Sequence, residues 1–359
     1  MARVSATRST SLYTLLLISS LLLVSQTHVS SERVLKRPPI EKGLSWGYYT
    51  LCPLIGTIVR NNLNGVFKQN SGVAPGLLRL FFHDCFAQGC DASILLNGDG
   101  EDDEKQHDAN IGIRSEAIEV VEDLRSSLSL LCPFASVSCS DILVLAASEA
   151  VYQLGGPELD VPLGRKDSLT FNASAPDELP SPFSKTDEIL EAFAAKNFDA
   201  EEVVALSGAH TYGRAHCPTF FNRIAETDPP IDADFRNKIA ATCPDEESFN
   251  TMNLDVRTPE KFDNMYYINL LNRQGLFTSD QDLASNSKTK EIVNKFASDQ
   301  KAFFDKFADA FVKVSQLNVI TDKNYKGRGE VRKRCFFPNK RKSSRTSVEE
   351  TVLELAQQI

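Results

Sequence analysis

Downstream of residue 24 the sequence lacks any apolar run that approaches the roughly 18 residues of a membrane-spanning helix. No Cys-x-x-Cys pair occurs, which argues against a zinc ribbon and against a thioredoxin-like site. An excess of positive charge is also missing, because the net charge is −9 and the isoelectric point is about 5.2. We therefore expect no membrane span and no nucleic-acid partner.

The alternating apolar pattern of strands is scarce, and no internal repeat is visible. Helical periodicity predicts helices over residues 116–130, 140–154, 199–209 and 299–317, with Asp199 as an N-cap of the third. A stripe of phenylalanines in the last of these favours a hydrophobic core over a cofactor site. The sequence therefore predicts a mainly α-helical protein.

The N-terminus has the pattern of a secretory signal peptide. Arg3 and Arg8 precede an apolar run over residues 12–24, which is too short and too broken for an anchor. We expect a signal peptide over residues 1–31, with cleavage between about residues 25 and 31, and export of the mature chain.

All eight cysteines follow this segment, so an oxidising compartment predicts four disulfides. The residues alone do not select among the alternative connectivities. Asn172-Ala173-Ser174 is a glycosylation sequon and predicts an exposed loop. Beyond Cys335, residues 336–359 contain a basic stretch and a weakly amphipathic segment, for which a sorting signal and a disordered tail both stay open.

One run, residues 79–93, combines many reactive side chains. Arg79 and His83 are spaced i, i+4, so a helix projects both from one face. The guanidinium lowers the imidazole pKa, because a second positive charge there is disfavoured. Such a pair joins an acid–base group to a group that stabilises an anion.

A lone His-Asp dipeptide is usually not catalytic, and His83-Asp84 also fits the ligands of a divalent-metal phosphohydrolase. The following residues favour calcium instead, because Asp84, Gly89, Asp91 and Ser93 alternate oxygen donors with a turn residue. The short spacing from Cys85 to Cys90 suits a disulfide-closed loop around such an ion.

A second histidine, His210, ends the helix predicted over residues 199–209, where a buried histidine is more often structural. Oxygen-bearing residues recur downstream and, together with Thr211, predict a second calcium site. The alternative is an N-capped helix start at Thr258-Pro259-Glu260. The downstream residues are Asp255, Thr258 and Asp263.

With these motifs, and with all eight cysteines, the chain resembles the secretory (class III) plant haem peroxidases over roughly residues 43–335. The resemblance implies the all-α plant peroxidase fold in a domain over 32–335, one haem b and two calcium ions. It implies a secreted, monomeric enzyme that reduces hydrogen peroxide and oxidises small phenolic donors in one-electron steps. Lignification, wall cross-linking, stress response and peroxide removal are the expected roles, and a vacuolar destination through the C-terminal extension stays open.

The resemblance assigns the peroxide side of the haem to one group of residues. His83 is the base that moves a proton between the two peroxide oxygens, and Arg79 stabilises the departing oxygen. Phe82 lies beside the haem. The Asn110 amide accepts from the His83 ring, and the Glu104 carboxylate steadies Asn110.

On the other side, His210 is implied as the iron ligand and Asp280 as the carboxylate bonded to its second nitrogen, which favours O–O cleavage. Pro180 is implied at the haem edge where donors approach. The implied distal calcium ligands are Asp84, Ala87 and Gly89 (carbonyls), Asp91 and Ser93, and the proximal ones are Thr211, Asp255, Thr258, Lys261 (carbonyl) and Asp263. The implied disulfides are Cys52–Cys132, Cys85–Cys90, Cys139–Cys335 and Cys217–Cys243.

The chain departs from the family pattern after Asn110. From there to Arg114 it is one residue shorter than usual, and Ala109 replaces a frequent proline. Two functions other than an active peroxidase stay open from the sequence. One is a catalytically silent wall protein that binds calcium and haem, and the other is the His-Asp metal hydrolase.

Overall fold

The computed structural model describes residues 38–98, 103–225, 228–324 and 329–339. The expected signal peptide and nearly all of the C-terminal extension lie outside these residues. Contacts divide the chain into a unit that ends at Pro39 and a second unit from Ile40 to the C-terminus, and the elements below belong to the second. Its described residues form eleven α-helices with short 3-10 segments between them, as the all-α prediction requires.

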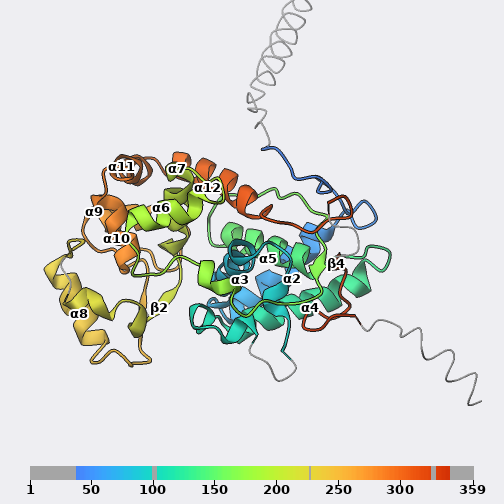
Figure 1. Cartoon of the computed structure of the whole chain (residues 1–359), viewed down its shortest axis with the longest axis horizontal. Helices are drawn as coiled ribbons and strands as arrows, with labels where there is room; N and C mark the ends of the chain where they lie inside the picture. The colour runs from blue at the N-terminus through green and yellow to red at the C-terminus, as the bar shows by residue number, and fades with distance from the viewer. Residues whose placement is uncertain (1–37, 99–102, 226–227, 325–328, 340–359) are drawn as a thin grey trace, which may run out of the picture. The chain divides into compact units, whose positions relative to one another are not determined.

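The first four helices pack on one another, and Figure 1 shows them together on the right. Helix α5 lies at their centre and is buried along nearly its whole length, which agrees with its near-continuous apolar sequence. Ser138 caps its N-terminus by accepting from the main-chain nitrogen of Asp141. These helices are α2 (Ile55–Gln69), α3 (Val73–Ala87), α4 (Ser115–Leu131) and α5 (Cys139–Gln153). The turns between α3 and α4 include η1 (Ser93–Leu95), η2 (Glu104–Gln106) and η3 (Asp108–Asn110).

The later helices lie mostly on the left of Figure 1, and α12 packs along both α7 and α3. Aromatic rings on α12 form the core that the phenylalanine stripe predicted, for example through the stacked pair Phe81–Phe311 at 4.4 Å. The helices are α6 (Thr186–Ala194), α7 (Ala200–Ser207), α8 (Ala233–Thr242), α9 (Met265–Leu271), α10 (Thr278–Ser285), α11 (Lys290–Ser298) and α12 (Gln300–Val314). The 3-10 segments here are η4 (Ala175–Glu178), η5 (Gly208–Thr211), η6 (Cys217–Thr219) and η7 (Phe221–Ile224).

Strands are few and short in the described residues. Strand β1 (Asp167–Ser168) pairs with β4 (Gly329–Glu330), and β2 (Arg214–His216) pairs with β3 (Thr251–Asn253), both antiparallel. The second pair ties the segment after η5 to the segment before Asp255. No helix of the described residues is long and apolar enough to cross a membrane.

The four predicted helices are confirmed with small changes at their ends. Asp199 caps α7 through a 2.8 Å bond from the Glu202 main-chain nitrogen, as predicted. That helix stops at Ser207 and tightens into η5, so His210 lies in a 3-10 turn beyond it. The alternative helix start at Thr258 is wrong, because residues 258–261 form a turn and α9 begins at Met265.

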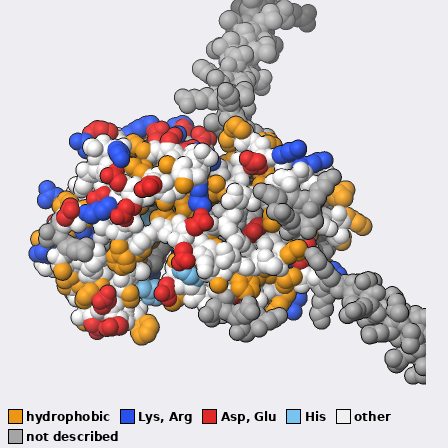
Figure 2. Space-filling model, in the orientation of Figure 1, with side chains coloured by type: hydrophobic (Ala, Val, Ile, Leu, Met, Phe, Trp, Pro, Cys, Tyr) orange, Lys and Arg blue, Asp and Glu red, His pale blue; other side chains and the backbone are white. Residues whose placement is uncertain are grey.

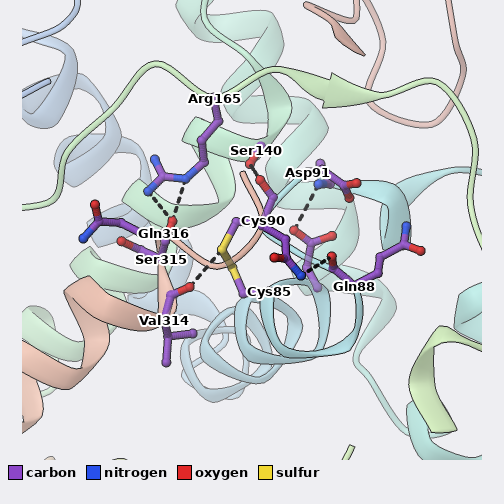
Figure 3. The surroundings of a disulfide bond; sticks show 12 residues. Cys85, Gln88, Cys90, Asp91, Ser140, Arg165, Val314, Ser315 and Gln316 are labelled. Atoms are coloured by element: carbon purple, nitrogen blue, oxygen red, sulfur yellow. Dashed lines mark hydrogen bonds between the residues drawn. A yellow bond between two sulfur atoms is a disulfide. The ribbon is translucent and has the colours of Figure 1, made fainter. Parts of the chain in front are cut away.

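Four disulfides crosslink the described part of the chain. They join the pairs that the resemblance implies, which are Cys52–Cys132, Cys85–Cys90, Cys139–Cys335 and Cys217–Cys243. Figure 3 shows the short loop between Cys85 and Cys90 beside the end of α12. The Ser140 hydroxyl donates to the Cys90 carbonyl at 2.8 Å, and the Cys90 nitrogen donates to Leu317 at 3.0 Å. The loop after α3 is therefore held by α5 and by the segment that follows α12.

Candidate active site

Helix α3 buries one side and leaves a stripe of the other side partly exposed. Leu77, Leu80 and Phe81 pack into the core and fix the rotation of the helix. The partly exposed stripe consists of Leu78, Arg79, Phe82 and His83. Within it, Nε of Arg79 lies 3.4 Å from Nε2 of His83, so the i, i+4 pair meets as predicted.

The His83 ring is oriented by Asn110. Nδ1 of His83 lies 2.6 Å from Oδ1 of Asn110, and the Asn110 amide nitrogen donates to the main-chain carbonyl of Glu104 at 2.6 Å. Because that carbonyl can only accept, it fixes the amide orientation, and Nδ1 of His83 must carry the ring proton. Nε2 therefore presents its lone pair and can act as a base.

The structure differs from the prediction for Glu104 in one respect. Its main-chain oxygen, and not its carboxylate, accepts the hydrogen bond from the Asn110 amide, because the turn η2 orients this carbonyl toward the amide. The carboxylate instead accepts from the main-chain nitrogen of Asn172 at 3.1 Å, and burial raises the pKa of Glu104 to about 7. Glu104 thus joins the turn before Asn110 to the loop that carries the sequon, in which Asn172 is exposed.

The electrostatics favour a neutral His83. Burial, and next the positive charge of Arg79, lower the pKa of His83 to about 3, against which the Asn110 bond acts weakly. A ring that is neutral at ordinary pH can take a proton from a ligand, while Arg79 stays charged beside it.

A second imidazole is held by a different carboxylate. Nδ1 of His210 lies 2.7 Å from Oδ1 of Asp280, whose side chain is 3% exposed while that of His210 is 38% exposed. Oδ2 of Asp280 accepts from the Phe277 main-chain nitrogen at 3.0 Å, and the Phe277 ring lies edge-on to the imidazole. Nε2 of His210 has no hydrogen-bond partner among the described residues, and the His210 side chain is partly exposed in a turn where Gly208 and Thr211 are buried.

The sequence reasoning missed Tyr266. Its hydroxyl donates to Oδ1 of Asp280 at 2.9 Å. The same carboxylate oxygen therefore accepts hydrogen bonds from both Tyr266 and His210. Tyr266 is buried in α9. A tyrosine on the apolar face of a short helix was the available signal, since a buried hydroxyl needs a partner.

The two imidazole-bearing segments are neighbours. The Tyr212 hydroxyl reaches the Ser71 carbonyl at 3.4 Å, and a Cβ on Gly213 would lie 3.2 Å from Pro75. Pro180 is partly exposed in the loop after η4, a segment that packs against α3. Figure 2 shows histidine side chains at the surface, next to acidic side chains, so imidazole groups are within reach of solvent.

This arrangement fits a haem. An imidazole whose Nδ1 is bonded to a buried carboxylate, with Nε2 unpaired and exposed, is the usual form of a haem ligand. The partly exposed stripe on α3 supplies a second imidazole, His83, whose Nε2 lies beside the Arg79 guanidinium.

The predicted distal calcium residues converge after α3. Burial, and next the neighbouring Asp91, raise the pKa of Asp84 well above its ordinary value, and burial raises the pKa of Asp91 to about 6. The buried Ser93 hydroxyl lies near these carboxylates yet makes no hydrogen bond of normal geometry among the described residues. Gly89, at φ +139°, makes the turn, and the buried Ala87 precedes it. Buried carboxylates with an unpaired hydroxyl fit a calcium ion.

The predicted proximal residues also gather around one point. The Thr211 hydroxyl lies 3.2 Å from Oδ2 of Asp255, 3.4 Å from Oδ1 of Asp263 and 3.5 Å from the Lys261 carbonyl. The Thr258 hydroxyl lies 3.3 Å and 3.0 Å from the same two carboxylates. Thr211 directly follows His210, and this all-oxygen set fits a second calcium ion.

Within the described ranges, no three His, Cys, Asp or Glu side chains form a common metal site. The His-Asp metal hydrolase needs such a ligand set around His83 and Asp84, and none exists there. Each predicted calcium site has two aspartate ligands, with hydroxyls and carbonyls as the other predicted oxygens.

Comparison with known proteins gives one consistent result. Residues 59–299 match a family model described as Peroxidase. The chain is 43% identical over 339 residues to Peroxidase 12 of Arabidopsis thaliana, covering 92% of this chain and 93% of that protein. It is 44% identical to Cationic peroxidase SPC4 of Sorghum bicolor (85% and 84% covered) and 40% identical to Lignin-forming anionic peroxidase of Nicotiana tabacum (80% and 90% covered).

Proposed function

Because this chain belongs to the class III plant peroxidase family, we propose that its His83, Arg79, Asn110, His210 and Asp280 carry out the family's reaction. The protein is a haem peroxidase that uses hydrogen peroxide. One peroxide and two phenols give two waters and two phenoxyl radicals in the reaction we propose. Haem, when bound, supplies the redox-active iron for the two-electron reduction of peroxide.

The proposed work of the distal side chains is proton transfer. Nε2 of His83 takes a proton from one peroxide oxygen and delivers it to the other, which then leaves as water. Arg79 stabilises the negative charge that grows on that leaving oxygen. The bond from His83 to Asn110 supports this role, since it keeps the proton on Nδ1 and the lone pair on Nε2.

On the proximal side, we assign His210 as the haem ligand and Asp280 as the group that holds its ring. We also assign one calcium ion to each oxygen cluster, where the positive charge would balance buried carboxylates. Phe82 would border the haem, and Pro180 would border the donor approach. The four disulfides and an occupied glycan site at Asn172 complete the proposed mature enzyme, with a domain over 32–335.

We propose that the electron donors are small phenols. We also propose that lignification and wall cross-linking are among the physiological roles of their oxidation. One relative is named a lignin-forming anionic peroxidase, and this chain is also anionic, with a net charge of −9. The N-terminal pattern supports export to the cell wall, and the C-terminal extension supports the vacuole as the alternative destination. We propose that the mature enzyme is a monomer, as the family resemblance implies.

The single observation that carries this proposal is that both imidazoles have Nδ1 anchored and Nε2 directed away from the anchor. The test is oxidation of guaiacol by the purified, haem-loaded protein with added peroxide. Turnover that depends on both reagents is expected. A haem-loaded protein without turnover would instead favour the silent wall protein.

A further inference from the structure

The turn η3, which carries Asn110, is tied to a single histidine that precedes it, His107. The Ala109 main-chain nitrogen donates to Nδ1 of the His107 ring at 3.1 Å. The next two main-chain nitrogens, of Asn110 and Ile111, donate to the His107 carbonyl at 2.7 Å and 3.1 Å. Asn110 is buried, whereas the His107 side chain is 25% exposed. The start of η3 therefore depends on both the ring and the main chain of His107.

The two ring bonds of His107 fix its protonation state. A main-chain N–H can only donate, so Nδ1 must present its lone pair to Ala109. Nε2 then carries the ring proton and donates to Oδ1 of Asp177 at 2.9 Å, and Asp177 belongs to η4, which packs against η3. A second proton on the ring would occupy the Nδ1 lone pair. His107 can therefore accept from Ala109 only as a neutral imidazole.

The Ala109 main chain connects this ring to the proposed peroxide side. Its nitrogen donates to His107, and its carbonyl accepts from an outer nitrogen (NH2) of Arg79 at 3.0 Å. The next residue is Asn110, which orients the His83 ring. The proline that is frequent in the family at this position has a fixed φ and no N–H. Ala109 has a free φ and an N–H, and the bond to His107 supplies the missing restraint.

We infer that His107 is a positioning residue for the peroxide reaction, and that it acts only while its ring is neutral. It holds the Ala109 peptide, and through that peptide it places Asn110 and the guanidinium of Arg79. The inference rests on the proposed function, because Asn110 and Arg79 act in the reaction proposed above. The charged groups on η3 and on the segments that contact it are the same in every variant below: Arg79, Glu104, Lys105, Asp108, Asp177 and Glu178.

The first measurement needs no peroxide. Hydrogen–deuterium exchange of the Ala109 amide in the haem-loaded protein, read by mass spectrometry of fragments that contain it, reports the bond to the ring. His107→Leu should speed this exchange about threefold to tenfold, as expected for one lost hydrogen bond. His107→Asn should keep the wild-type exchange, because an asparagine side chain accepts from the nitrogen two residues on. Asn286→Leu is the matched control, since it removes a bond of the same kind, to the Lys288 nitrogen at 2.9 Å.

The second measurement is the rate constant for reaction with peroxide, followed by stopped-flow absorbance between pH 5 and pH 8, where histidines ordinarily change charge. At pH 8, His107→Leu should react about threefold to tenfold more slowly than the wild type, and His107→Asn should match it. At pH 5, His107→Asn should exceed the wild type by a similar factor, because its side chain takes up no proton. Asn286→Leu should follow the wild type at each pH.

The inference is overturned if His107→Leu reacts as fast as Asn286→Leu at pH 8, or if His107→Asn and the wild type share one pH profile. Should His107→Leu fail to fold, the ratio of His107→Asn to the wild type decides alone. A ratio that rises from pH 8 to pH 5 supports the inference, and a constant ratio overturns it. A wild-type protein that reacts with peroxide at no pH would instead contradict the proposed function, and the inference would fall with it.

Discussion

Asn110 accepts from the His83 ring at 2.6 Å while its own amide nitrogen donates at 2.6 Å to the Glu104 carbonyl. These two short bonds leave the amide no freedom to rotate, so the proton of His83 is fixed on Nδ1. The loop after Asn110, which is one residue shorter in this chain than is usual in the family, does not break this contact. The basicity of Nε2, and with it the proposed peroxide step, therefore depends on a residue that never touches the peroxide.

Replacing that amide tests the dependence. Asn110→Leu should lower the rate constant for reaction with peroxide about 10- to 100-fold, because the ring loses its orientation and its fixed tautomer. Stopped-flow absorbance would measure the rate. Asn272→Leu, an exposed asparagine at the end of α9, is the control and should react at the wild-type rate. Equal rates in the two variants would remove Asn110 from the mechanism.

Replacing the base itself should have a larger effect. His83→Leu should slow the reaction with peroxide by about 10²- to 10⁴-fold, since no other neutral base lies on the exposed stripe of α3. The haem absorption band should persist, because His83 is not the proposed ligand. Retained activity with retained haem would show that proton transfer does not use this residue.

The carboxylate behind His210 should set the electron density on the ring. Asp280→Asn removes the negative charge that accepts from Nδ1, so the ferric–ferrous reduction potential should become more positive. Asp282→Asn is the control on the same helix, because that carboxylate accepts from the Thr186 nitrogen at 2.8 Å. Potentiometric titration of both variants measures the shift. An equal potential in both would mean that Asp280 does not act on the ring.

Calcium removal should destabilise the fold. An ion present at 100 times its dissociation constant stabilises the native state by about 2.7 kcal/mol, which chelation would remove. The difference in Tm between calcium-loaded and chelated protein measures this term. Ser93→Ala should reduce the difference, because it removes a hydroxyl that we assign as a calcium ligand. Ser126→Ala, at an exposed position, should not. A calcium-independent Tm in the wild type would refute both ion sites.

Some of the site followed directly from local sequence. The i, i+4 spacing predicted the meeting of Arg79 with His83, and the Asp199 cap predicted the start of α7, because both depend on one helix. The bond between His210 and Asp280 spans 70 residues, so only the resemblance suggested it. The sequence did not predict the contact of Tyr266 with Asp280 or the main-chain contact of Glu104 with Asn110. Each depends on the orientation of a short helix or a turn in the folded chain.

The most direct test of the central claim concerns His210. The absorption and electron paramagnetic resonance spectra of the ferric haem-loaded protein should show one histidine ligand. His210→Gly should lose that spectrum and recover it when free imidazole is added. An unchanged spectrum in His210→Gly, with no response to imidazole, would contradict the account.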